Sequence, residues 1–569
     1  MNHDPRRTTV SSLPLSPLYR AESLRKIGKH ELDVLVVGGG VTGAGIALDA
    51  ASRGLSVALV EARDFAAGTS SRSSKLIHGG LRYLEQLDFK LVREALKERG
   101  LLLQKLAPHL VRPVKFLVPL QHRVWERGYI GAGVTLYDTL GGARALPRHR
   151  HLSRRRAFEV APGLADDALI GAIQYYDAQV DDARHTMMIA RTAAEQGASV
   201  LTRTRMTELL REGDRVVGAK VVDLESGAEI EVRAKTVIAA TGVWSDDMSK
   251  AAGIPAPFTV RASKGVHLVV PREKIDLDTG LILRTEKSVL FVIPWGRHWI
   301  VGTTDTEWEL DRDHPAASRA DVDYVLDHLN AVLRKPITHD DIEGVYAGLR
   351  PLLAAKAAAT TKLSREHAVA HPVPGLVIIA GGKYTTYRVM AADAVDVAME
   401  DVAKPAPPSW TDRLPIAGAE GYHELWRNRA TLGLPMERAE HLLGRYGTRI
   451  TDLLAMIDKR PELGEPIPGA EEYLKAEAVY AASHEGALHL EDVLTRRTRI
   501  SIEVTDRGVT AAPEVAALIA PLLGWDAARQ QREVDNYLAR VKAELSAQDQ
   551  PDDVAANASR LDAPALLPG

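Results

Sequence analysis

Residues 33–45 read Asp-Val-Leu-Val-Val-Gly-Gly-Gly-Val-Thr-Gly-Ala-Gly, a short apolar run followed at once by a glycine-rich turn. β-Branched residues dominate the apolar run, which is typical of a strand. An apolar-periodic stretch continues to Gly54, a residue type that commonly ends helices, and residues 57–60 predict a second strand. The stretch therefore predicts one βαβ unit: a strand, a tight turn, a helix and a second strand.

The glycine spacing in this turn indicates a dinucleotide site. Gly38, Gly40 and Gly43 fit the pattern G-x-G-x-x-G, in which backbone amides and a helix N-terminus approach a pyrophosphate. Glu61 ends the second strand, roughly 20 residues further on, where a carboxylate accepts hydrogen bonds from a ribose. An ordinary tight turn is the alternative. Because the chain has a single such fingerprint, residues outside it must decide between FAD and NAD.

Length, charge and cysteine content restrict the function. The chain has 569 residues, more than one hydrophobic core usually organises, so we expect two or three structural units. A formal net charge of −3 provides no global attraction for nucleic acid, and we expect no such partner. The absence of cysteine excludes disulfides, thiolate metal sites, iron–sulfur clusters and a cysteinyl flavin. We expect no metal site.

No secretory signal is evident at the N-terminus, and no uncharged apolar run approaches the roughly 18 residues of a spanning helix. We therefore expect a cytoplasmic protein whose membrane contact is peripheral.

Strand and helix patterns divide the chain further. Two runs, 236–240 and 376–380, look like strands that end at glycine beside a ligand, and residues 264–270, 288–294 and 299–304 predict a second sheet. We predict an oxidoreductase domain at residues 31–405. Its cofactor part comprises about 31–110, 180–250 and 340–405, and its substrate part comprises about 111–179 and 251–339. A helical domain is predicted at 410–545, and disorder is predicted at 1–30 and 546–569.

A long motif follows the βαβ unit. Residues 69–84 read Thr-Ser-Ser-Arg-Ser-Ser-Lys-Leu-Ile-His-Gly-Gly-Leu-Arg-Tyr-Leu, and with residues 36–45 they resemble the FAD-dependent glycerol-3-phosphate dehydrogenase family. The likeness covers about residues 31–405 densely and the C-terminal part more loosely. Further matching stretches are 180–184, 240–242, 264–267, 301–305, 348–351 and 381–388. Val266 and Tyr384 depart from the residues common in the family, without removing a charged ligand.

The resemblance implies a fold and a reaction. The fold would be α/β, with a Rossmann-type FAD-binding domain, a mixed β-sheet substrate domain and a C-terminal all-α domain. The reaction would be oxidation of sn-glycerol 3-phosphate to dihydroxyacetone phosphate, with hydride transfer from C2 to flavin N5 and electrons passed to a membrane quinone. Three alternatives remain open: an oxidase that produces hydrogen peroxide, an amine or amino-acid oxidase, and a flavin-binding protein without turnover.

Cofactor contacts follow from the fingerprint and the resemblance together. The glycines at 381–382 precede a predicted helix whose positive end would stabilise the reduced flavin. The residues expected to bind the cofactor are Gly38, Gly40, Val41, Thr42, Gly43, Glu61, Thr69, Ser70, Ser74, Lys75, Leu76, Thr241, Gly242, Gly382, Lys383, Thr385 and Thr386.

Substrate contacts are implied by the resemblance and by charge. A phosphate dianion in a closed pocket requires cations. The expected substrate-binding residues are Arg82, Tyr83, Lys264, Arg350, Arg365 and Lys383. A base must take the hydroxyl proton, and His267 is the first candidate, with Arg350 polarising the substrate oxygen and His78 as the second candidate. A strand histidine that only hydrogen-bonds beside the flavin is the alternative for His267.

A basic and aromatic stretch, residues 112–156, suggests a partner surface. Its arginines would contact anionic lipid headgroups, with Trp125 and Tyr129 at the interface, as expected of a quinone reductase on the inner face of the cell membrane. A solvated arginine-rich loop is the alternative. The sequence leaves a homodimer open.

Overall fold

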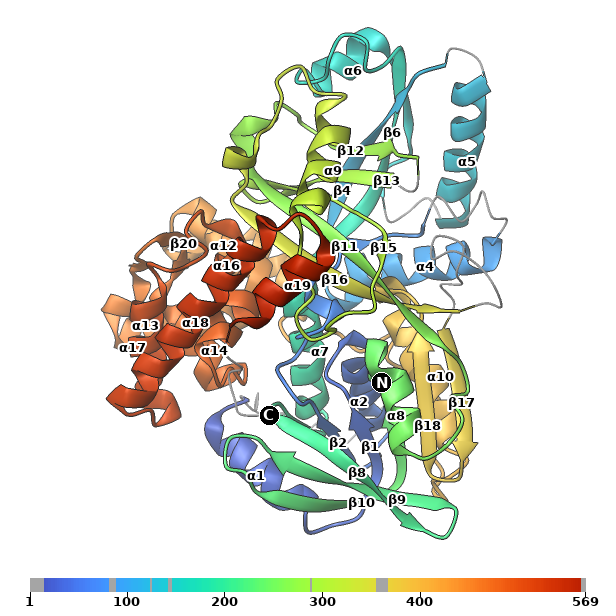
Figure 1. The fold of residues 1–569 in the computed structure, drawn as a ribbon, viewed down its shortest axis with the longest axis vertical. Helices are drawn as coiled ribbons and strands as arrows, with labels where there is room; N and C mark the ends of the chain where they lie inside the picture. The colour runs from blue at the N-terminus through green and yellow to red at the C-terminus, as the bar shows by residue number, and fades with distance from the viewer. Residues whose placement is uncertain are drawn as a thin grey trace.

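Two large sheets organise the computed structural model, which describes residues 15–80, 88–122, 125–141, 146–286, 289–354 and 367–563 (Figure 1). The first sheet has the order β17-β18-β10-β1-β2-β7, with β9 paired to β10 and β8 to β9. The predicted βαβ unit lies at its parallel centre. Its strands are β1 Leu32–Val37, β2 Val57–Val60, β7 Ser199–Leu201, β8 Thr204–Glu212, β9 Arg215–Asp223, β10 Glu229–Ala239, β17 His367–Val373 and β18 Leu376–Gly381.

Both faces of this sheet are covered, so β1 is buried at every position. Val34 and Val36 pack with helices α2 (Val41–Ser52), α7 (Asp182–Glu195) and α10 (Tyr387–Ala398). Leu35 and Val37 face the opposite side, against α1 (Pro17–Ile27), α8 (Ser245–Ala251) and the β8–β9 hairpin. The alternation follows from the two-residue period of a strand.

The second sheet is mixed and has the order β15-β11-β14-β13-β12-β4-β6-β3, with β16 paired to β11 and β5 to β6. Helices α6 (Arg154–Val160) and α9 (Arg319–Asn330) cover one face, and α4 (Phe89–Leu101) and α5 (Trp125–Gly141) cover the other. Its strands are β3 Leu76–Ile77, β4 Val111–Leu120, β5 Arg150–Ser153, β6 Gly171–Val180, β11 Val260–Pro271, β12 Gly280–Arg284, β13 Val289–Trp295, β14 His298–Gly302, β15 Thr306–Glu307 and β16 Gly344–Leu353.

The C-terminal part is helical and lies beside both sheets, coloured orange to red in Figure 1. A small hairpin, β19 Pro466–Ile467 and β20 Ala470–Leu474, interrupts the helices. The helices are α11 Tyr422–Arg427, α12 Met436–Tyr446, α13 Ile450–Lys459, α14 Lys475–His484, α15 Leu490–Asp492, α16 Ile500–Glu503, α17 Ala512–Leu523, α18 Ala527–Gln548 and α19 Asp553–Leu561. The fold class is therefore the one predicted.

Three boundary predictions need correction. Disorder was expected at residues 1–30; residues 1–14 lie outside the described residues, but α1 forms a capped helix at Pro17–Ile27 and buries Ile27 in the first sheet's core. Disorder was also expected at 546–569; residues 564–569 lie outside the described residues, but α18 extends to Gln548 and α19 follows. Polar composition concealed both helices because their stability comes from packing on the rest of the protein. Finally, β3 and β16 belong to the second sheet, not to the cofactor part.

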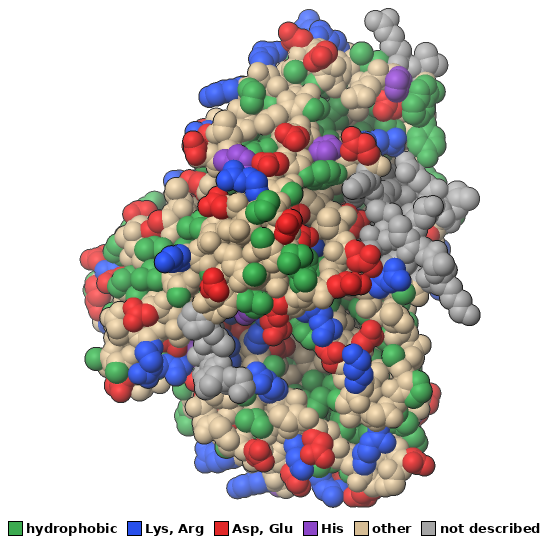
Figure 2. Space-filling view, in the orientation of Figure 1, with side chains coloured by type: hydrophobic (Ala, Val, Ile, Leu, Met, Phe, Trp, Pro, Cys, Tyr) green, Lys and Arg blue, Asp and Glu red, His purple; other side chains and the backbone are tan. Residues whose placement is uncertain are grey.

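Charged side chains of both signs lie on the face of the molecule shown in Figure 2. Acidic and basic side chains are interspersed there, in line with the small net charge of −3. Among the described residues, we find no helix with the length and apolar character needed to cross a membrane.

Candidate active site between the two sheets

A cavity of about 840 Å³ lies between the two sheets. One wall is the carboxyl end of the parallel strands β1, β2, β10 and β18, and the other wall comes from β11 and β16 of the second sheet. Ligands of doubly wound folds bind at this end of the strands, and the volume is within the ~300–1,000 Å³ usual for ligand pockets. The cavity is therefore the candidate active site.

The turn after β1 needs its glycines. Gly38 has a φ of +112°, and a Cβ there would lie 2.5 Å from the carbonyl oxygen of Ala240. A Cβ at Gly43 would overlap the carbonyl oxygen of Gly38, so this glycine permits close packing of helix on strand. The Val41 amide begins α2 and donates to Ser70 Oγ at 2.9 Å. This exposed helix start is suited to a pyrophosphate.

Glu61 is held in a fixed orientation at the end of β2. Its Oε2 accepts a hydrogen bond from the Gly39 amide at 2.6 Å, and its Oε1 accepts one from the Arg63 amide at 2.7 Å. The carboxylate therefore lies beside the phosphate turn, at the position that the spacing of a ribose-binding acid predicts.

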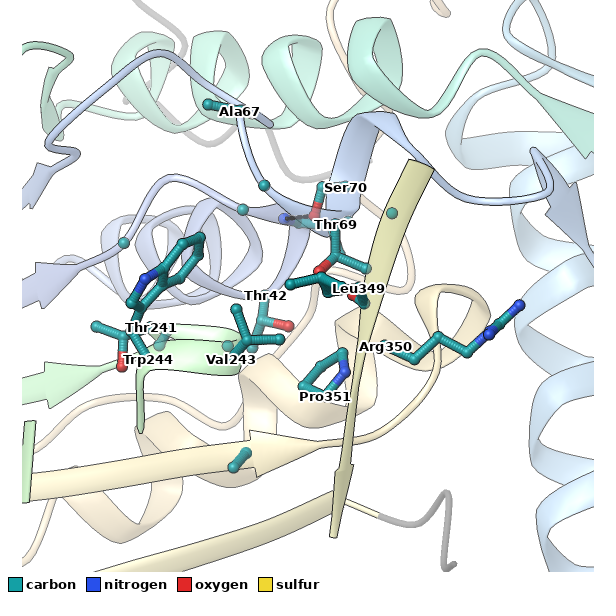
Figure 3. Close-up of a pocket in the computed structure, with 18 of the residues that line it drawn as sticks. Thr42, Ala67, Thr69, Ser70, Thr241, Val243, Trp244, Leu349, Arg350 and Pro351 are labelled. Carbon is teal, nitrogen blue, oxygen red and sulfur yellow. Dashed lines mark hydrogen bonds between the residues drawn. The ribbon is translucent and has the colours of Figure 1, made fainter. Parts of the chain in front are cut away.

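Most of the predicted cofactor residues line this cavity, and Figure 3 shows several of them around it. Those that line it are Gly38, Gly40, Val41, Thr42, Glu61, Thr69, Ser70, Ser74, Leu76, Thr241, Gly242, Gly382, Lys383 and Thr385. Gly43, Lys75 and Thr386 lie behind the lining. Lys75 is fully buried and donates to Asp182 Oδ1 at 2.8 Å, so its side chain supports the wall and does not contact a ligand.

His267 lies on β11 and faces the cavity. Its Nε2 is 2.8 Å from Ser74 Oγ, and its ring stacks on Tyr346 with centroids 4.9 Å apart and planes 11° apart. A Cβ at Gly302 on the neighbouring strand would lie 2.5 Å from the ring, so that glycine makes room for it. Burial first, and then the Arg350 and Lys75 cations, lower the pKa of His267 well below its usual value. The imidazole is therefore neutral near pH 7.

Arg350 reaches the same cavity from β16. Its Nη2 donates to Thr303 Oγ1 at 2.8 Å and to the Thr304 carbonyl at 3.2 Å. A Cβ at Gly265 would lie 2.5 Å from Thr303 Oγ1 and would overlap the guanidinium. In Figure 3 the Arg350 side chain leaves β16 on the side opposite to Leu349 and Pro351. Gly265 therefore leaves the space that the guanidinium occupies.

The prediction for Lys264 needs correction. It was expected to bind substrate, but it does not line the cavity, and its ammonium pairs with Asp321 at 2.5 Å and with Asp553. In a strand, successive side chains point to opposite faces, so Lys264 must point away from the cavity if Gly265 and His267 face it. His78 and Lys383 do line the cavity. Three other candidates, Arg82, Tyr83 and Arg365, lie outside the described residues.

Comparisons with known proteins show the family to which the chain belongs. Residues 33–388 match the FAD dependent oxidoreductase family, and residues 409–530 match the C-terminal domain of alpha-glycerophosphate oxidase. Glycerol-3-phosphate dehydrogenase 2 of Mycobacterium tuberculosis strain H37Rv is 59% identical over 554 residues, which cover 97% of this chain and 95% of that protein. The chain belongs to the FAD-dependent glycerol-3-phosphate dehydrogenase family.

More distant proteins named glycerol-3-phosphate dehydrogenase also match most of the chain. The human mitochondrial glycerol-3-phosphate dehydrogenase is 37% identical over 543 residues, covering 91% of this chain and 74% of that protein. A crystal structure of glycerol-3-phosphate dehydrogenase from Bacillus halodurans with FAD is 28% identical, has a TM-score of 0.77, and covers 93% of this chain and 98% of that one.

FAD is the cofactor of this family, and the cavity suits it. The glycine turn after β1 would hold the pyrophosphate, and the Glu61 carboxylate, oriented by the Gly39 amide, would face the ribose. The start of η7 (Tyr384–Thr386), which leads into α10, is available near the second sheet, where the flavin ring would meet His267 and Arg350. FAD would therefore lie with its ring beside the residues expected to do the chemistry.

Sequence reasoning missed several lining residues. Arg72, Trp244, Leu349 and Pro351 line the cavity without having been assigned to it. Tyr346, which stacks on His267, was also missed. A signal was present: strand alternation places Tyr346 and Arg350 on the same face of β16, because they are four residues apart.

Proposed function

We propose that this chain oxidises sn-glycerol 3-phosphate to dihydroxyacetone phosphate and passes the electrons to a membrane quinone. The observation that carries the proposal is that His267 and Arg350, from paired strands, both face the FAD cavity. A proton acceptor and a cation are what oxidation of a phosphorylated alcohol needs. The name of the 59% identical mycobacterial relative supports the substrate.

The proposed chemistry separates a hydride and a proton. FAD, held in the cavity, would supply the acceptor for the hydride of C2. The hydroxyl proton passes to the neutral imidazole of His267, which Ser74 and Tyr346 hold in place, and the C2–O bond becomes a carbonyl. The Arg350 guanidinium, fixed by Thr303 and Thr304, polarises that oxygen as its charge develops. His78, which also lines the cavity, is the second candidate for the base.

Phosphate binding is proposed to use several cations. Arg350 and Lys383 line the cavity, and a dianion there would be stabilised by both charges. Arg82, Tyr83 and Arg365 complete the proposed set from the family resemblance.

Helix α5 supports peripheral contact with the inner face of the cell membrane. Trp125, Tyr129 and Leu136 are exposed, by 58%, 52% and 37% respectively, and helical spacing places them on one face. The opposite face buries Ile130 and Val134 in the second sheet's core. The basic stretch 148–156 begins beside this helix, since His149 Nδ1 lies 2.7 Å from Asp138. Such a pairing of aromatic and basic side chains favours anionic lipid headgroups.

The reaction is tested by adding sn-glycerol 3-phosphate to the yellow holoenzyme without oxygen. Rapid bleaching of the flavin absorbance that a quinone analogue reverses would support the dehydrogenase. Fast recovery with oxygen and release of peroxide would favour an oxidase, an outcome suggested by the family matched at residues 409–530. Absence of bleaching would exclude the proposed substrate, and bleaching by an amino acid would point to an amino-acid oxidase.

A further inference from the structure

A second cavity, of about 60 Å³, lies where the C-terminal helices meet the flavin-binding loop. It is lined by Arg72 of that loop, by His314, by the middle of β16, and by Arg540, Glu544 and Arg560 of helices α18 and α19. A single water needs roughly 10–15 Å³, so this space can hold several waters or one small ion. Arg72 lines both cavities, whereas His314 and the residues of α18 and α19 line the second cavity alone.

The lining of this second cavity is strongly cationic. It contains the guanidinium groups of Arg72, Arg499, Arg540 and Arg560 and one carboxylate, that of Glu544. Arg499 is neutralised by Asp181 at 2.6 Å and by Asp182 at 2.5 Å. Glu544 Oε1 is shared between Arg540 at 3.1 Å and Arg560 at 3.5 Å. Positive charge therefore exceeds negative charge in the cavity, even though Glu491 acts on Arg540 and Asp311 on Arg560 from further away.

Arg72 is the cation with the least compensation. Within the described residues, its guanidinium forms no hydrogen bond or ion pair. Burial first, and then repulsion from Arg63, lower the pKa of Arg72 to about 9, with Arg560 and Arg496 acting in the same direction and only Glu544 opposing. Arg72 is half-buried, and a cation that has lost part of its hydration is stabilised when an anion accompanies it.

His314 adds a neutral donor. Its Nδ1 lies 3.3 Å from Arg560 Nη2, a group that can only donate, so the imidazole accepts there and carries its proton on Nε2. Burial, followed by repulsion from Arg560, lowers the pKa of His314 to about 3. The histidine therefore stays uncharged and does not compete with the arginines for an anion.

We propose that this cavity binds a small oxyanion of the phosphate or sulfate class. A tetrahedral oxyanion would accept hydrogen bonds from Arg72 and Arg560 together, and charge-assisted bonds of this kind are the strong ones. The cavity volume of about 60 Å³ suits the free ion better than the larger phosphate ester. Because Arg72 belongs to the flavin-binding loop and Arg560 to α19, the ion joins the C-terminal helices to the cofactor domain. This site is additional to the proposed substrate site.

The test counts inorganic phosphate bound per chain of holoenzyme by equilibrium dialysis. The variants are Arg560→Gln and Arg72→Gln, which remove a donor from opposite sides of the cavity. Arg334→Gln is the matched control, because Arg334 forms an ion pair with Asp166 and both side chains are mostly exposed, at 59% and 84%. We expect wild type and Arg334→Gln to bind one phosphate more than either cavity variant, and flavin absorbance identifies variants that fold.

Competing anions distinguish phosphate bound in the active site from phosphate bound in the second cavity. Dihydroxyacetone phosphate should displace phosphate from the active site alone, and sulfate should displace it from both. If the wild type and both cavity variants bind equal numbers of phosphate ions, the proposal is wrong. Displacement of the extra phosphate by glycerol 2-phosphate would show that the site accepts esters and would overturn its restriction to free ions.

Discussion

Lys264 on β11 and Asp553 at the start of α19 form an ion pair across 289 residues of sequence. Asp321 accepts from the same ammonium at 2.5 Å, and Ser318 Oγ donates to Asp321 at 2.9 Å and to Asp553 at 3.1 Å. The lysine side chain is fully buried. The C-terminal helix is therefore anchored to the strand that carries His267, on the face opposite to the cavity.

Substitution of Asp553 by Asn tests this anchor. Asp321 remains as a partner and the Asp553 side chain is 29% exposed, so we expect a loss of about 1–2 kcal/mol in the free energy of unfolding, less than for a fully buried pair. Lys264→Met leaves two carboxylates without their cation and should cost about 3–5 kcal/mol. Denaturant unfolding of the holoenzyme measures both values.

Asp549→Asn is the control for this anchor, because Asp549 pairs with Arg319 at the surface, where ion pairs contribute about 0–1 kcal/mol. Equal stability of Lys264→Met and wild type would show that the pair does not hold the helix.

Replacement of His267 by Gln should slow flavin reduction by roughly 10²–10⁴-fold, the usual contribution of a general base, while the flavin spectrum is retained. Ser74→Ala removes only the 2.8 Å hydrogen bond to Nε2 and should slow the same step less. Stopped-flow bleaching under anaerobic conditions measures both rates. A rate for His267→Gln equal to that of wild type would transfer the role of base to His78.

The pH profile gives a second test of His267. The pKa of His267 in the folded protein lies well below the ordinary value of about 6.5. The imidazole is therefore already neutral at pH 6.5 and can accept a proton. We expect the rate of flavin reduction to be flat from about pH 6.5 upwards, where this group does not titrate, and to fall only at lower pH. A midpoint at about 6.5 that disappears in His267→Gln would show that burial does not depress the pKa.

Gly265→Ala should displace Arg350 and leave FAD in place. The added Cβ would overlap the guanidinium and lie 2.5 Å from Thr303 Oγ1, and no atom of the phosphate turn is among its nearest neighbours. We expect kcat/KM for sn-glycerol 3-phosphate to fall by at least tenfold at unchanged flavin content. Gly128→Ala is the matched control, since nothing lies within 4 Å of its Cβ position. Retained activity in Gly265→Ala would argue against a role for Arg350.

Membrane contact through α5 is tested with the double variant Trp125→Ser/Tyr129→Ser. Both side chains are more than half exposed, so the fold should be unaffected, whereas binding to vesicles with anionic lipid should weaken severalfold. Met436→Ser, at a position that is 47% exposed in the helical domain, serves as control. Sedimentation with vesicles measures the bound fraction. Equal binding of all three proteins would remove α5 from the interface.

Acid should loosen the helical domain. Burial raises the pKa of Asp181, but the Arg499 and Arg445 cations outweigh it, and the net pKa is lowered. A carboxyl with a depressed folded pKa contributes stability above its unfolded pKa of about 3.9, and that stability is lost as the pH falls towards the folded value. We expect the free energy of unfolding to be insensitive to this group at pH 5–8 and to drop below about pH 4.

Arg499→Met provides the matching variant for the acid test. It should cost about 3–5 kcal/mol at pH 7, because Asp181 and Asp182 lose the buried guanidinium that they share, although Arg445 and Lys75 remain beside them. The deficit should shrink as the pH falls below about 4, where the Asp181 carboxyl begins to protonate. A deficit independent of pH would show that the packing of Arg499, and not its charge, holds the domain.

The features that could be predicted from the sequence depend on residues that lie close together in it. The βαβ unit and its phosphate turn depend on neighbours in sequence: glycines that allow close approach, a strand of β-branched residues, and a carboxylate at the next strand end. His267 and Arg350 were also predicted to face the flavin, through the family resemblance, and both line the cavity. Lys264 was misplaced because strand alternation was not applied to the motif at residues 264–267.

Sequence by itself therefore predicted the fold class, the FAD cofactor and a set of cofactor residues most of which line the cavity, because backbone geometry and short-range spacing set the phosphate turn. Tertiary structure alone decided that Lys264 pairs with Asp553, that residues 17–27 and 553–561 form helices, and that Arg72 and Arg560 share a cavity. Those relationships join charges hundreds of residues apart. A buried charge is defined by the groups packed around it, and no local pattern records which groups those are.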